Sequence, residues 1–361
     1  MVAVEAELVG GECPYWACIP SKMMIRAGNL LAEARRVPGM AGDSQVTPDF
    51  APVAARIRDE ATDDWNDQVA VDRFTRKGGR FVRGRALLTG PGRVEAEGEM
   101  FAVRRAVVLA TGSRPQIPPV PGLEGVPYWT NRQAVSVKEP PTSLLVLGGG
   151  AIGMELAQAF ARFGTAMTVV EAMERLLPTE EPEAGALLAE VLAEEGITIR
   201  TAARATAVRH VDHALRLTLD SGQEIAGQHL LVATGRRPQL AGQALPRVTF
   251  TDPEVGSVGL TEHAARVQGL RVRTGTARVP SSARGWIHKA GNQGLVKLVE
   301  DTGRGVLAGA TSAGPAGGEV LFGLALAVQN EIPVERLRHM IFAYPTFHRA
   351  VEDALTDLGH H

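Results

Sequence analysis

The feature that most constrains the fold is a glycine-rich turn in the middle of the chain, between an apolar run at residues 144–147 and a helical pattern at 154–163. A second apolar run at 167–170 follows and ends at an acid, Glu171. This order of strand, turn, helix, strand and acid predicts a βαβ unit that binds a dinucleotide. The alternative is a glycine-rich turn without a ligand. The glycines of the G-x-G-x-x-G pattern are Gly148, Gly150 and Gly153.

Each position of this unit has a mechanical reason. Gly148 permits the tight turn, Gly150 lets a pyrophosphate approach the backbone at the helix N-terminus, and Gly153 lets the helix pack closely on the strand. Glu171 is expected to bind the ribose hydroxyls, and its charge would repel a 2'-phosphate. The pattern therefore favours NADH over NADPH, and Arg175, four residues later, moderates that preference.

Length and charge exclude several classes of protein. The 361 residues predict two or three domains, and 38 basic against 40 acidic residues give a net charge of -2, which argues against a nucleic acid or a charged membrane surface as partner. No apolar run approaches the ~18 residues of a membrane span. The sequence shows no basic leader and has only two cysteines, so we expect a cytoplasmic protein without structural disulfides.

The two cysteines are nevertheless only five positions apart, at Cys13 and Cys18. In a regular helix such residues are separated by a rise of about 7.5 Å and point to different sides, so a bridge needs an irregular turn, which Pro14 helps to provide. The alternative is two buried thiols. Zinc is excluded because it needs four ligands and no further Cys or nearby His is present, so no metal site is expected.

Four other segments have a recognisable pattern. Residues 1–6 are expected to form a short buried strand ending at the acid Glu5, and residues 18–36 have the spacing of a helix. Residues 53–76 form a polar, helix-like stretch. Short strands and turns are expected over 80–108.

Two apolar segments end in the same tripeptide, Ala-Thr-Gly. Residues 107–110 lead into Thr111 and Gly112, and residues 230–233 lead to Gly235. Two buried strands that open through small residues suit backbone that passes beside a bound cofactor, so these polar and glycine positions are candidate cofactor-binding residues. The tripeptide is common, and the repeat alone does not identify the cofactor.

Residues 10–22 resemble a known signature. Their sequence, G-G-E-C-P-Y-W-A-C-I-P-S-K, is similar to the redox-disulfide motif G-G-x-C-x4-C-I-P-S-K of the pyridine nucleotide-disulfide oxidoreductases, which include dihydrolipoyl dehydrogenase, glutathione reductase and mercuric reductase. The order of later motifs also agrees. These are A-T-G-S-R-P at 110–115, the glycine pattern at 148–153, A-T-G-R-R-P at 233–238, and T-F-T-D-P-E-V-G-S-V-G-L-T-E at 249–262.

The resemblance implies an α/β fold with Rossmann-like three-layer nucleotide-binding domains and an α+β C-terminal dimerisation domain. The implied domains are an incomplete FAD-binding domain with the cysteine pair at 1–118, an NAD-binding domain at 119–240 and a dimerisation domain at 245–358. A homodimer is therefore expected, with a two-fold axis relating the subunits.

The resemblance also implies a mechanism in which NADH reduces FAD and the flavin passes electrons to a Cys13–Cys18 disulfide or to an acceptor. Cys18 corresponds to the thiolate that touches the flavin, and Cys13 to the interchange thiol that meets substrate. Lys22 corresponds to a lysine near the flavin and Glu155 to its ion-pair partner. Glu5 corresponds to the acid that binds the ribose of the FAD adenosine.

The sequence departs from the family pattern at the flavin site. The family opens with its own G-x-G-x-x-G unit, of which only the strand ending at Glu5 is present in this sequence. The Gly-Asp that holds the flavin ribityl chain is also missing, because Pro238 is followed within about ten residues by Leu245. We therefore expect FAD to be absent or incompletely bound, either through deletion or because the sequence omits segments of the protein.

A third departure concerns the substrate. Family disulfide reductases carry His-Pro-Thr-x-x-Glu near the C-terminus, whereas here Tyr344 replaces the histidine and Arg349 the glutamate. Tyrosine, with a pKa of ~10, is a poor base near neutral pH. His348 and Glu352 form either a substitute pair or an ordinary surface pair. We expect an enzyme with a small disulfide or a quinone as electron acceptor, and the alternative is a catalytically silent nucleotide-binding dimer.

Overall fold

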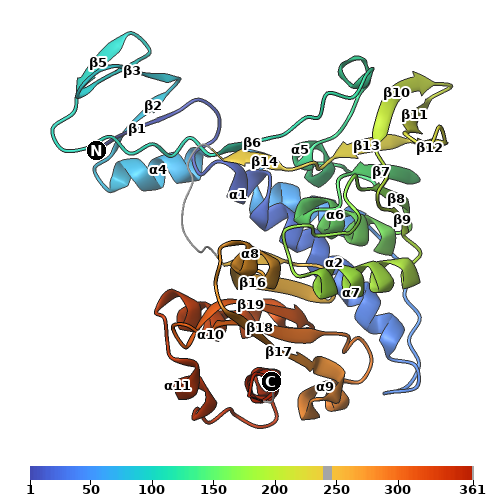
Figure 1. Cartoon of the computed structure of the whole chain (residues 1–361). Helices are drawn as coiled ribbons and strands as arrows, with labels where there is room; N and C mark the ends of the chain where they lie inside the picture. Colours follow the sequence, from blue (N-terminus) through green and yellow to red (C-terminus); the bar gives the residue numbers. More distant parts are fainter. Residues whose placement is uncertain (239–245, 360–361) are drawn as a thin grey trace.

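The structure, a computed structural model, describes residues 1–238 and 246–359. Two main sheets lie in different parts of the molecule, and a group of small sheets extends away from them near the N-terminus (Figure 1). The domain boundaries expected at 240 and 245 lie outside the described residues. No helix of the described chain is long and apolar enough to cross a membrane.

A four-stranded parallel sheet contains the glycine-rich unit, and its strand order is β13-β7-β8-β9. The predicted strands and helix at 144–170 are present with bounds shifted by no more than three residues. The strands are β7 (Ser143–Leu147), β8 (Ala166–Val170), β9 (Thr198–Arg200) and β13 (His229–Val232). The helices beside them are α6 (Ala151–Arg162) and α7 (Pro182–Glu194).

The C-terminal region is built on a five-stranded antiparallel sheet of order β15-β16-β19-β18-β17. An apolar helix, α10, packs on this sheet near the end of the chain. The strands are β15 (Arg247–Thr249), β16 (Glu254–Gly259), β17 (Val272–Arg278), β18 (Leu295–Asp301) and β19 (Val306–Gly314). The helices are α8 (Glu262–Val267), η3 (Val279–Ser281), α9 (Ala283–His288), α10 (Gly317–Gln329), α11 (Val334–Arg338) and α12 (Arg349–Asp357).

The N-terminal region contains the long helix α2 (Cys18–Arg36), whose predicted bounds are confirmed. The helix-like stretch at 53–76 is interrupted, because the backbone has positive φ at residues 63–65. The other helices of this region are α1 (Glu12–Tyr15), α3 (Ala51–Arg56), η1 (Ile57–Ala61) and α4 (Gln68–Arg76). Its strands are β1 (Val2–Glu5), β2 (Arg80–Arg83), β3 (Ala86–Gly90), β4 (Arg93–Ala96) and β5 (Glu99–Ala102).

The expectation of a buried strand at 107–110 is wrong. These residues have no strand structure, and Val107, Val108 and Leu109 are exposed. A buried strand needs neighbours that satisfy its backbone groups, and no described strand pairs with this segment. The remaining elements are β6 (Ser113–Pro115), η2 (Leu123–Gly125), α5 (Asn131–Val135), β10 (Ala205–Val211), β11 (Ala214–Leu219), β12 (Glu224–Gly227) and β14 (Arg236–Pro238).

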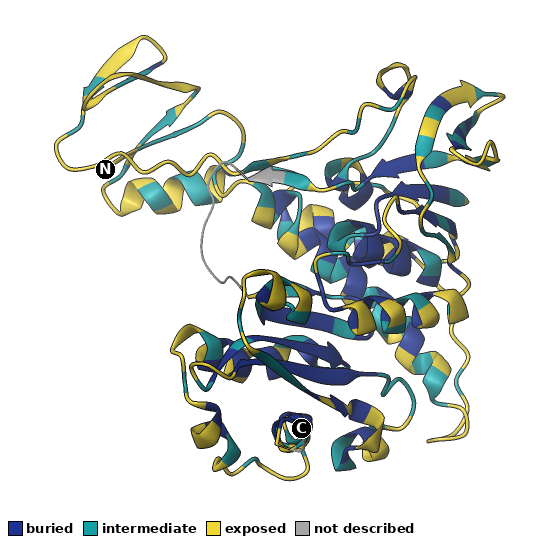
Figure 2. Cartoon of the chain, viewed as in Figure 1, coloured by how far each residue is buried: buried dark blue, intermediate teal, exposed yellow. Residues whose placement is uncertain are grey.

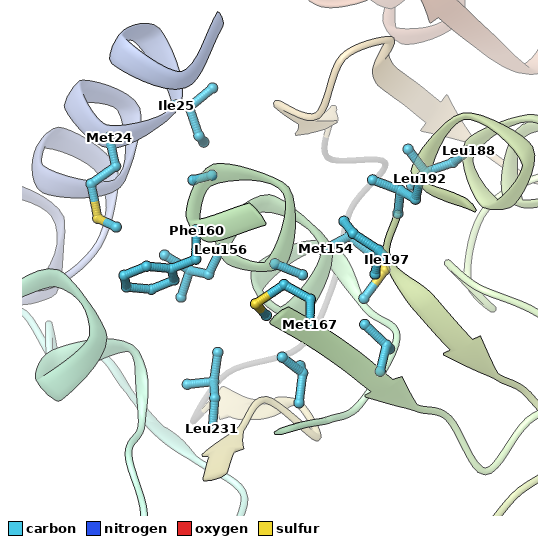
Figure 3. Close-up of a cluster of buried hydrophobic side chains, with 14 of the residues drawn as sticks. Met24, Ile25, Met154, Leu156, Phe160, Met167, Leu188, Leu192, Ile197 and Leu231 are labelled. Atoms are coloured by element: carbon cyan, nitrogen blue, oxygen red, sulfur yellow. The ribbon is translucent and has the colours of Figure 1, made fainter. Parts of the chain in front are cut away.

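The largest core joins α2 to the parallel sheet. Met24 and Ile25 of α2 belong to the same buried cluster as Phe160 of α6, Met167 of β8 and Leu231 of β13 (Figure 3). The buried colour is concentrated in the parallel and C-terminal sheets, whereas the small N-terminal sheets are mostly exposed (Figure 2). The core thus holds α2, which begins at Cys18, against the helix that follows the glycine turn.

Candidate functional site

The glycine-rich turn leaves β7 and enters α6 with the geometry that a dinucleotide needs. Gly148 has a φ of 113°, and a Cβ placed there would lie 2.5 Å from the carbonyl oxygen of Ala233. A Cβ on Gly153 would overlap the carbonyl oxygen of Gly148. At Gly150, in contrast, a Cβ would meet nothing within 4 Å. Two glycines are therefore required for packing, and the middle one faces open space at the N-terminus of α6, where a pyrophosphate fits.

Glu171 supports this turn from the end of β8. Its side chain is buried, and Oε2 accepts a hydrogen bond from the Gly149 N–H at 2.5 Å. The Oε1 atom accepts from the Met173 N–H at 2.7 Å. Arg175 donates to the carbonyl oxygens of Leu177 at 3.0 Å and Pro178 at 2.8 Å. Its guanidinium therefore binds its own loop and not a phosphate in this structure. Glu171 remains the predicted ribose ligand.

The two cysteines lie together at a break between two helices. Cys13 is in α1, Cys18 is the first residue of α2, and Ala17 between the helices has a non-helical conformation, with φ −136° and ψ −97°. Both side chains are exposed free thiols, so the alternative of two buried thiols is wrong. A hydrogen bond to Cys18, together with partial burial, raises the pKa of Cys13 to about 11. The irregular turn thus places the two thiols near enough for Cys18 to influence Cys13.

Lys22, four residues and about one helical turn after Cys18, forms an ion pair with Glu155 of α6. Its Nζ lies 2.6 Å from Glu155 Oε2, and the carboxylate is buried. Glu155 Oε1 also accepts from the Phe250 N–H at 2.9 Å, and Lys22 Nζ lies 4.7 Å from the centre of the Phe250 ring. The structure therefore brings together the predicted pair, and it adds Phe250, which the motif did not indicate because it is distant in the sequence.

The two A-T-G-x-R-P segments meet through their last residues. Strand β6 pairs antiparallel with β14, and the Gln116 N–H donates to the Gly235 carbonyl oxygen at 2.8 Å. Gly112 and Gly235 both have positive φ, of 68° and 114°. Thr111 precedes Gly112 in the exposed segment before β6. These candidates are therefore near one another in the fold, and their contact with a cofactor stays a prediction.

A flavin fits only part of this site. The resemblance assigns Cys18 and the Lys22–Glu155 ion pair to the flavin side, and Cys18 and Lys22 lie about one helical turn apart. Strand β1, however, pairs only with β2 in a two-stranded sheet, and Glu5 at its end accepts from the Glu7 N–H at 2.8 Å. With residues 107–110 also unpaired, the described residues do not form a complete FAD site.

The C-terminal candidates lie in the turn before α12 and in the first turn of that helix. Tyr344 is exposed, and its ring centre lies 5.7 Å from the Arg349 guanidinium. Glu352 Oε2 lies 2.7 Å from Arg349 Nη1, so the structure pairs Glu352 with Arg349 rather than with His348. The described residues contain no group of three or more His, Cys, Asp or Glu side chains that could hold a metal ion.

Comparison with known proteins agrees with this geometry. Residues 1–251 match the family described as "Pyridine nucleotide-disulphide oxidoreductase", and residues 245–355 match its dimerisation domain. A dihydrolipoyl dehydrogenase from Thermus scotoductus is 28% identical over 436 residues, covering 98% of this chain and 91% of the relative. A mercuric reductase from Shigella flexneri is 28% identical over 424 residues, covering 95% and 74%.

Solved structures share the fold. LpdA from Mycobacterium tuberculosis superposes with a TM-score of 0.83 at 23% identity, covering 99% of this chain and 93% of that one. The HOCl-induced flavoprotein disulfide reductase RclA from Escherichia coli has a TM-score of 0.80 at 20% identity, covering 99% and 94%. The alignment with the Thermus relative is longer than the 361 residues of this chain, so parts of that relative have no counterpart here. The chain belongs to the pyridine nucleotide-disulphide oxidoreductase family, whose members are enzymes.

Proposed function

We propose that this family member is an NADH-dependent disulfide oxidoreductase in which Cys13 and Cys18 are the redox-active pair. The observation that carries the proposal is the position of two exposed free thiols on either side of the helix break at Ala17, one turn from the Lys22–Glu155 ion pair. A dithiol that can close to a disulfide stores two electrons, and exposure lets an external acceptor reach it. FAD remains the cofactor that the family predicts.

In the proposed reaction the Cys13–Cys18 dithiol reduces a small acceptor disulfide by two successive thiol–disulfide exchanges. The Cys13 thiolate attacks one sulfur of the acceptor, the acceptor S–S bond breaks, and the first thiol leaves as a mixed disulfide forms. The Cys18 thiolate then attacks the Cys13 sulfur, which releases the second thiol and leaves a Cys13–Cys18 disulfide. Two electrons and the two thiol protons pass to the acceptor. NADH and one proton restore the dithiol and yield NAD⁺.

The raised pKa of Cys13 determines the pH dependence of this attack. At neutral pH the thiol of Cys13 keeps its proton in the hydrogen bond to Cys18, and only the thiolate is nucleophilic. Tyr344 occupies the position of the family base and is itself a poor base at neutral pH. We therefore expect disulfide reduction by the reduced protein to accelerate as pH rises from 7 toward 10, and a rate that is independent of pH would contradict the assignment of Cys13.

A homodimer completes this proposal. The match to a dimerisation domain covers residues 245–355, and large apolar side chains of that region are exposed, among them Trp286, Phe322 and Ile341. We infer a two-fold assembly in which Tyr344 of one subunit faces the cysteines of the other. Sedimentation at micromolar concentration tests it, and an active monomer of about 38 kDa would contradict the shared site.

A second candidate, a catalytically silent nucleotide-binding dimer, is favoured by the incomplete flavin site around β1 and residues 107–110. Both candidates bind nucleotide, so binding alone does not separate them. In the silent dimer, NADH binds but does not convert a Cys13–Cys18 disulfide into thiols.

The deciding experiment uses the purified full chain. Its absorbance spectrum shows whether flavin is bound, and NADH oxidation is measured with oxidised glutathione, lipoamide and a benzoquinone, with and without added FAD. We expect turnover with a disulfide that is lost in C13S and in C18S. If only the quinone is reduced, and C13S is as active as the wild type, the redox role of the pair is wrong. No turnover under any condition supports the silent dimer.

The choice of nucleotide is tested by Glu171→Ala. Loss of the carboxylate removes the predicted ribose ligand, so NADH affinity should fall about tenfold. NADPH affinity should fall less, because the repulsion of its 2'-phosphate is removed at the same time. Titration of both nucleotides by tryptophan fluorescence measures the two ratios, and equal losses would show that Glu171 does not contact the ribose.

A further inference from the structure

We propose that Arg132 is a positioning residue for the Cys13–Cys18 pair, connecting the thiol-bearing turn to the parallel sheet that carries the glycine-rich unit. The inference rests on the proposed function, because it takes the two thiols as the redox group. Arg132 lies in α5, more than 110 residues from either cysteine in the sequence, and no motif of the chain indicates it.

The contact begins at Glu12, the residue directly before Cys13. Arg132 approaches the Glu12 Oε1 atom with Nε at 3.0 Å and Nη2 at 2.7 Å. The Nη2 atom also lies 2.8 Å from Glu7 Oε2, and this hydrogen bond lowers the pKa of Glu7. One guanidinium therefore holds two carboxylates that flank the Gly-Gly turn before Cys13.

The same segment holds the residues between the two cysteines. The Asn131 side chain is buried, and its Nδ2 donates to the Trp16 carbonyl oxygen at 2.6 Å and to Glu12 Oε2 at 3.1 Å. The Arg132 guanidinium lies 5.2 Å from the centre of the Trp16 ring. On its other side, Trp16 stacks on Trp65 with ring centres 5.5 Å apart. The irregular turn that brings the thiols together is thus fixed on both sides of Cys13.

Helix α5 itself is attached to the parallel sheet. The Trp129 N–H donates to the Leu230 carbonyl oxygen at 2.7 Å, and the Val232 N–H donates to the Trp129 carbonyl oxygen at 2.8 Å. A capping box formed by Thr130 and Gln133 begins the helix. Because β13 pairs with β7, the strand that leads into the glycine turn, α5 is rigidly connected to the nucleotide-binding unit.

Two physical effects follow from this arrangement. Fixing Glu12 and Trp16 keeps Cys13 within reach of Cys18, and a displacement of about 1 Å between reacting groups can cost about a hundredfold in rate. The guanidinium also shares with Arg236, whose Nη2 lies 3.5 Å from Glu12 Oε2, the task of balancing the Glu12 charge beside Cys13, and a weaker balance there would disfavour the thiolate. Arg132 therefore supports both closure of the disulfide and the reactivity of Cys13.

The test measures the disulfide equilibrium directly. Full-length protein is equilibrated in glutathione buffers of known ratio, the remaining thiols are alkylated, and the Cys13–Cys18 disulfide is quantified by mass spectrometry. We expect R132A to lower the equilibrium constant for disulfide formation about tenfold and R132K, which keeps the charge and loses the fork, to lower it severalfold. The matched control is R209A, because Arg209 pairs with Glu224 on the small β10–β12 sheet.

Thermal unfolding of each variant separates positioning from general destabilisation. If R132A does not fold, E12Q, which keeps the side-chain volume and weakens the contact with the Arg132 guanidinium, should lower the equilibrium constant as well, because the turn before Cys13 is held less firmly. An equilibrium constant in folded R132A equal to that of R209A would overturn the inference. Failure of the proposed function has a different signature, in which the wild-type pair closes normally and Arg132 variants shift it, while NADH never reduces it.

Discussion

Two segments of similar sequence differ in secondary structure and burial in this molecule. Residues 230–235 and 107–112 are both apolar runs that end in Ala-Thr-Gly. Leu230 and Leu231 are 0% exposed in β13, whereas Val108 is 85% and Leu109 is 53% exposed in a segment without strand structure. The difference lies in the neighbours, because β13 has β7 beside it and a core cluster on each face.

The comparison shows that an apolar run becomes a buried strand only where other strands satisfy its backbone and other side chains cover it. The region around the glycine turn meets both conditions, and residues 107–110 meet neither in the described chain. The nucleotide end of the site is therefore held by many buried neighbours, whereas the flavin end is held by few. Four predictions test this contrast, from the largest effect to the smallest.

The largest effect on stability is expected from breaking a buried ion-pair cluster, compared with breaking an exposed ion pair. Lys297 is buried with its Nζ 3.1 Å from Glu181, 2.9 Å from Glu183 and 3.0 Å from Glu262. Lys297→Met leaves the buried Glu181 carboxylate without its ion-pair partner and should lower the free energy of unfolding by about 3–5 kcal/mol.

The matched change in the N-terminal region is Arg80→Met, because Arg80 pairs with Glu99 at the exposed surface. It should lower the free energy of unfolding far less, because an ion pair exposed to water contributes little to stability. Urea unfolding of both variants measures the difference, and losses of equal size would show that the two regions are equally well anchored.

Next in size is the contribution of each apolar run. Leu231→Ala should lower the free energy of unfolding by about 2–5 kcal/mol, because it leaves a cavity in the core. Val108→Ala removes an exposed side chain and should change it by no more than about 0.5 kcal/mol. Denaturant titration decides this, and a cost above about 1 kcal/mol at Val108 would mean that another surface covers it in solution.

The glycines of the two regions give a smaller contrast. Gly148→Ala places a Cβ against the Ala233 carbonyl at a φ of 113° and should cost about 2–3 kcal/mol. In Gly112→Ala the new Cβ meets no atom within 4 Å. The free energy of unfolding should fall by only about 1 kcal/mol, because of the φ of 68°. Thermal unfolding compares them. An equal loss of stability in the two variants would mean that other atoms lie beside residue 112 in solution.

The smallest effect concerns pH. Burial raises the pKa of Glu254, so its stability contribution is present below the unfolded value near 4.5 and is lost as pH rises through the folded pKa. Arg132 lowers the pKa of Glu7, so the contribution of Glu7 is present above about 4.5 and is lost as pH falls. Stability profiles of E254Q and E7Q against the wild type should therefore differ in opposite directions. Parallel profiles would contradict both assignments.

Much of the architecture follows from local pattern. The strand, glycine turn and helix at 144–163 could be predicted because each glycine has a local mechanical task, and the structure confirms these elements. The bounds of α2 were predictable from its helical spacing, and α10 from its apolar run. Spacing alone left the role of the two cysteines open, and the resemblance of the motif at 10–22 to a family signature indicated the cysteines and Lys22.

Tertiary structure decided what lies between distant residues. Phe250 beside Lys22, Arg132 beside Glu12, and the Glu171 hydrogen bond to Gly149 each join elements whose separation in the sequence gives no sign of contact. The sequence also could not decide whether residues 107–109 are buried. Nor could it decide whether the two thiols approach each other across an irregular turn. Hydrophobic periodicity and glycine geometry are local properties, whereas burial and hydrogen-bond partners depend on which segments fold against each other.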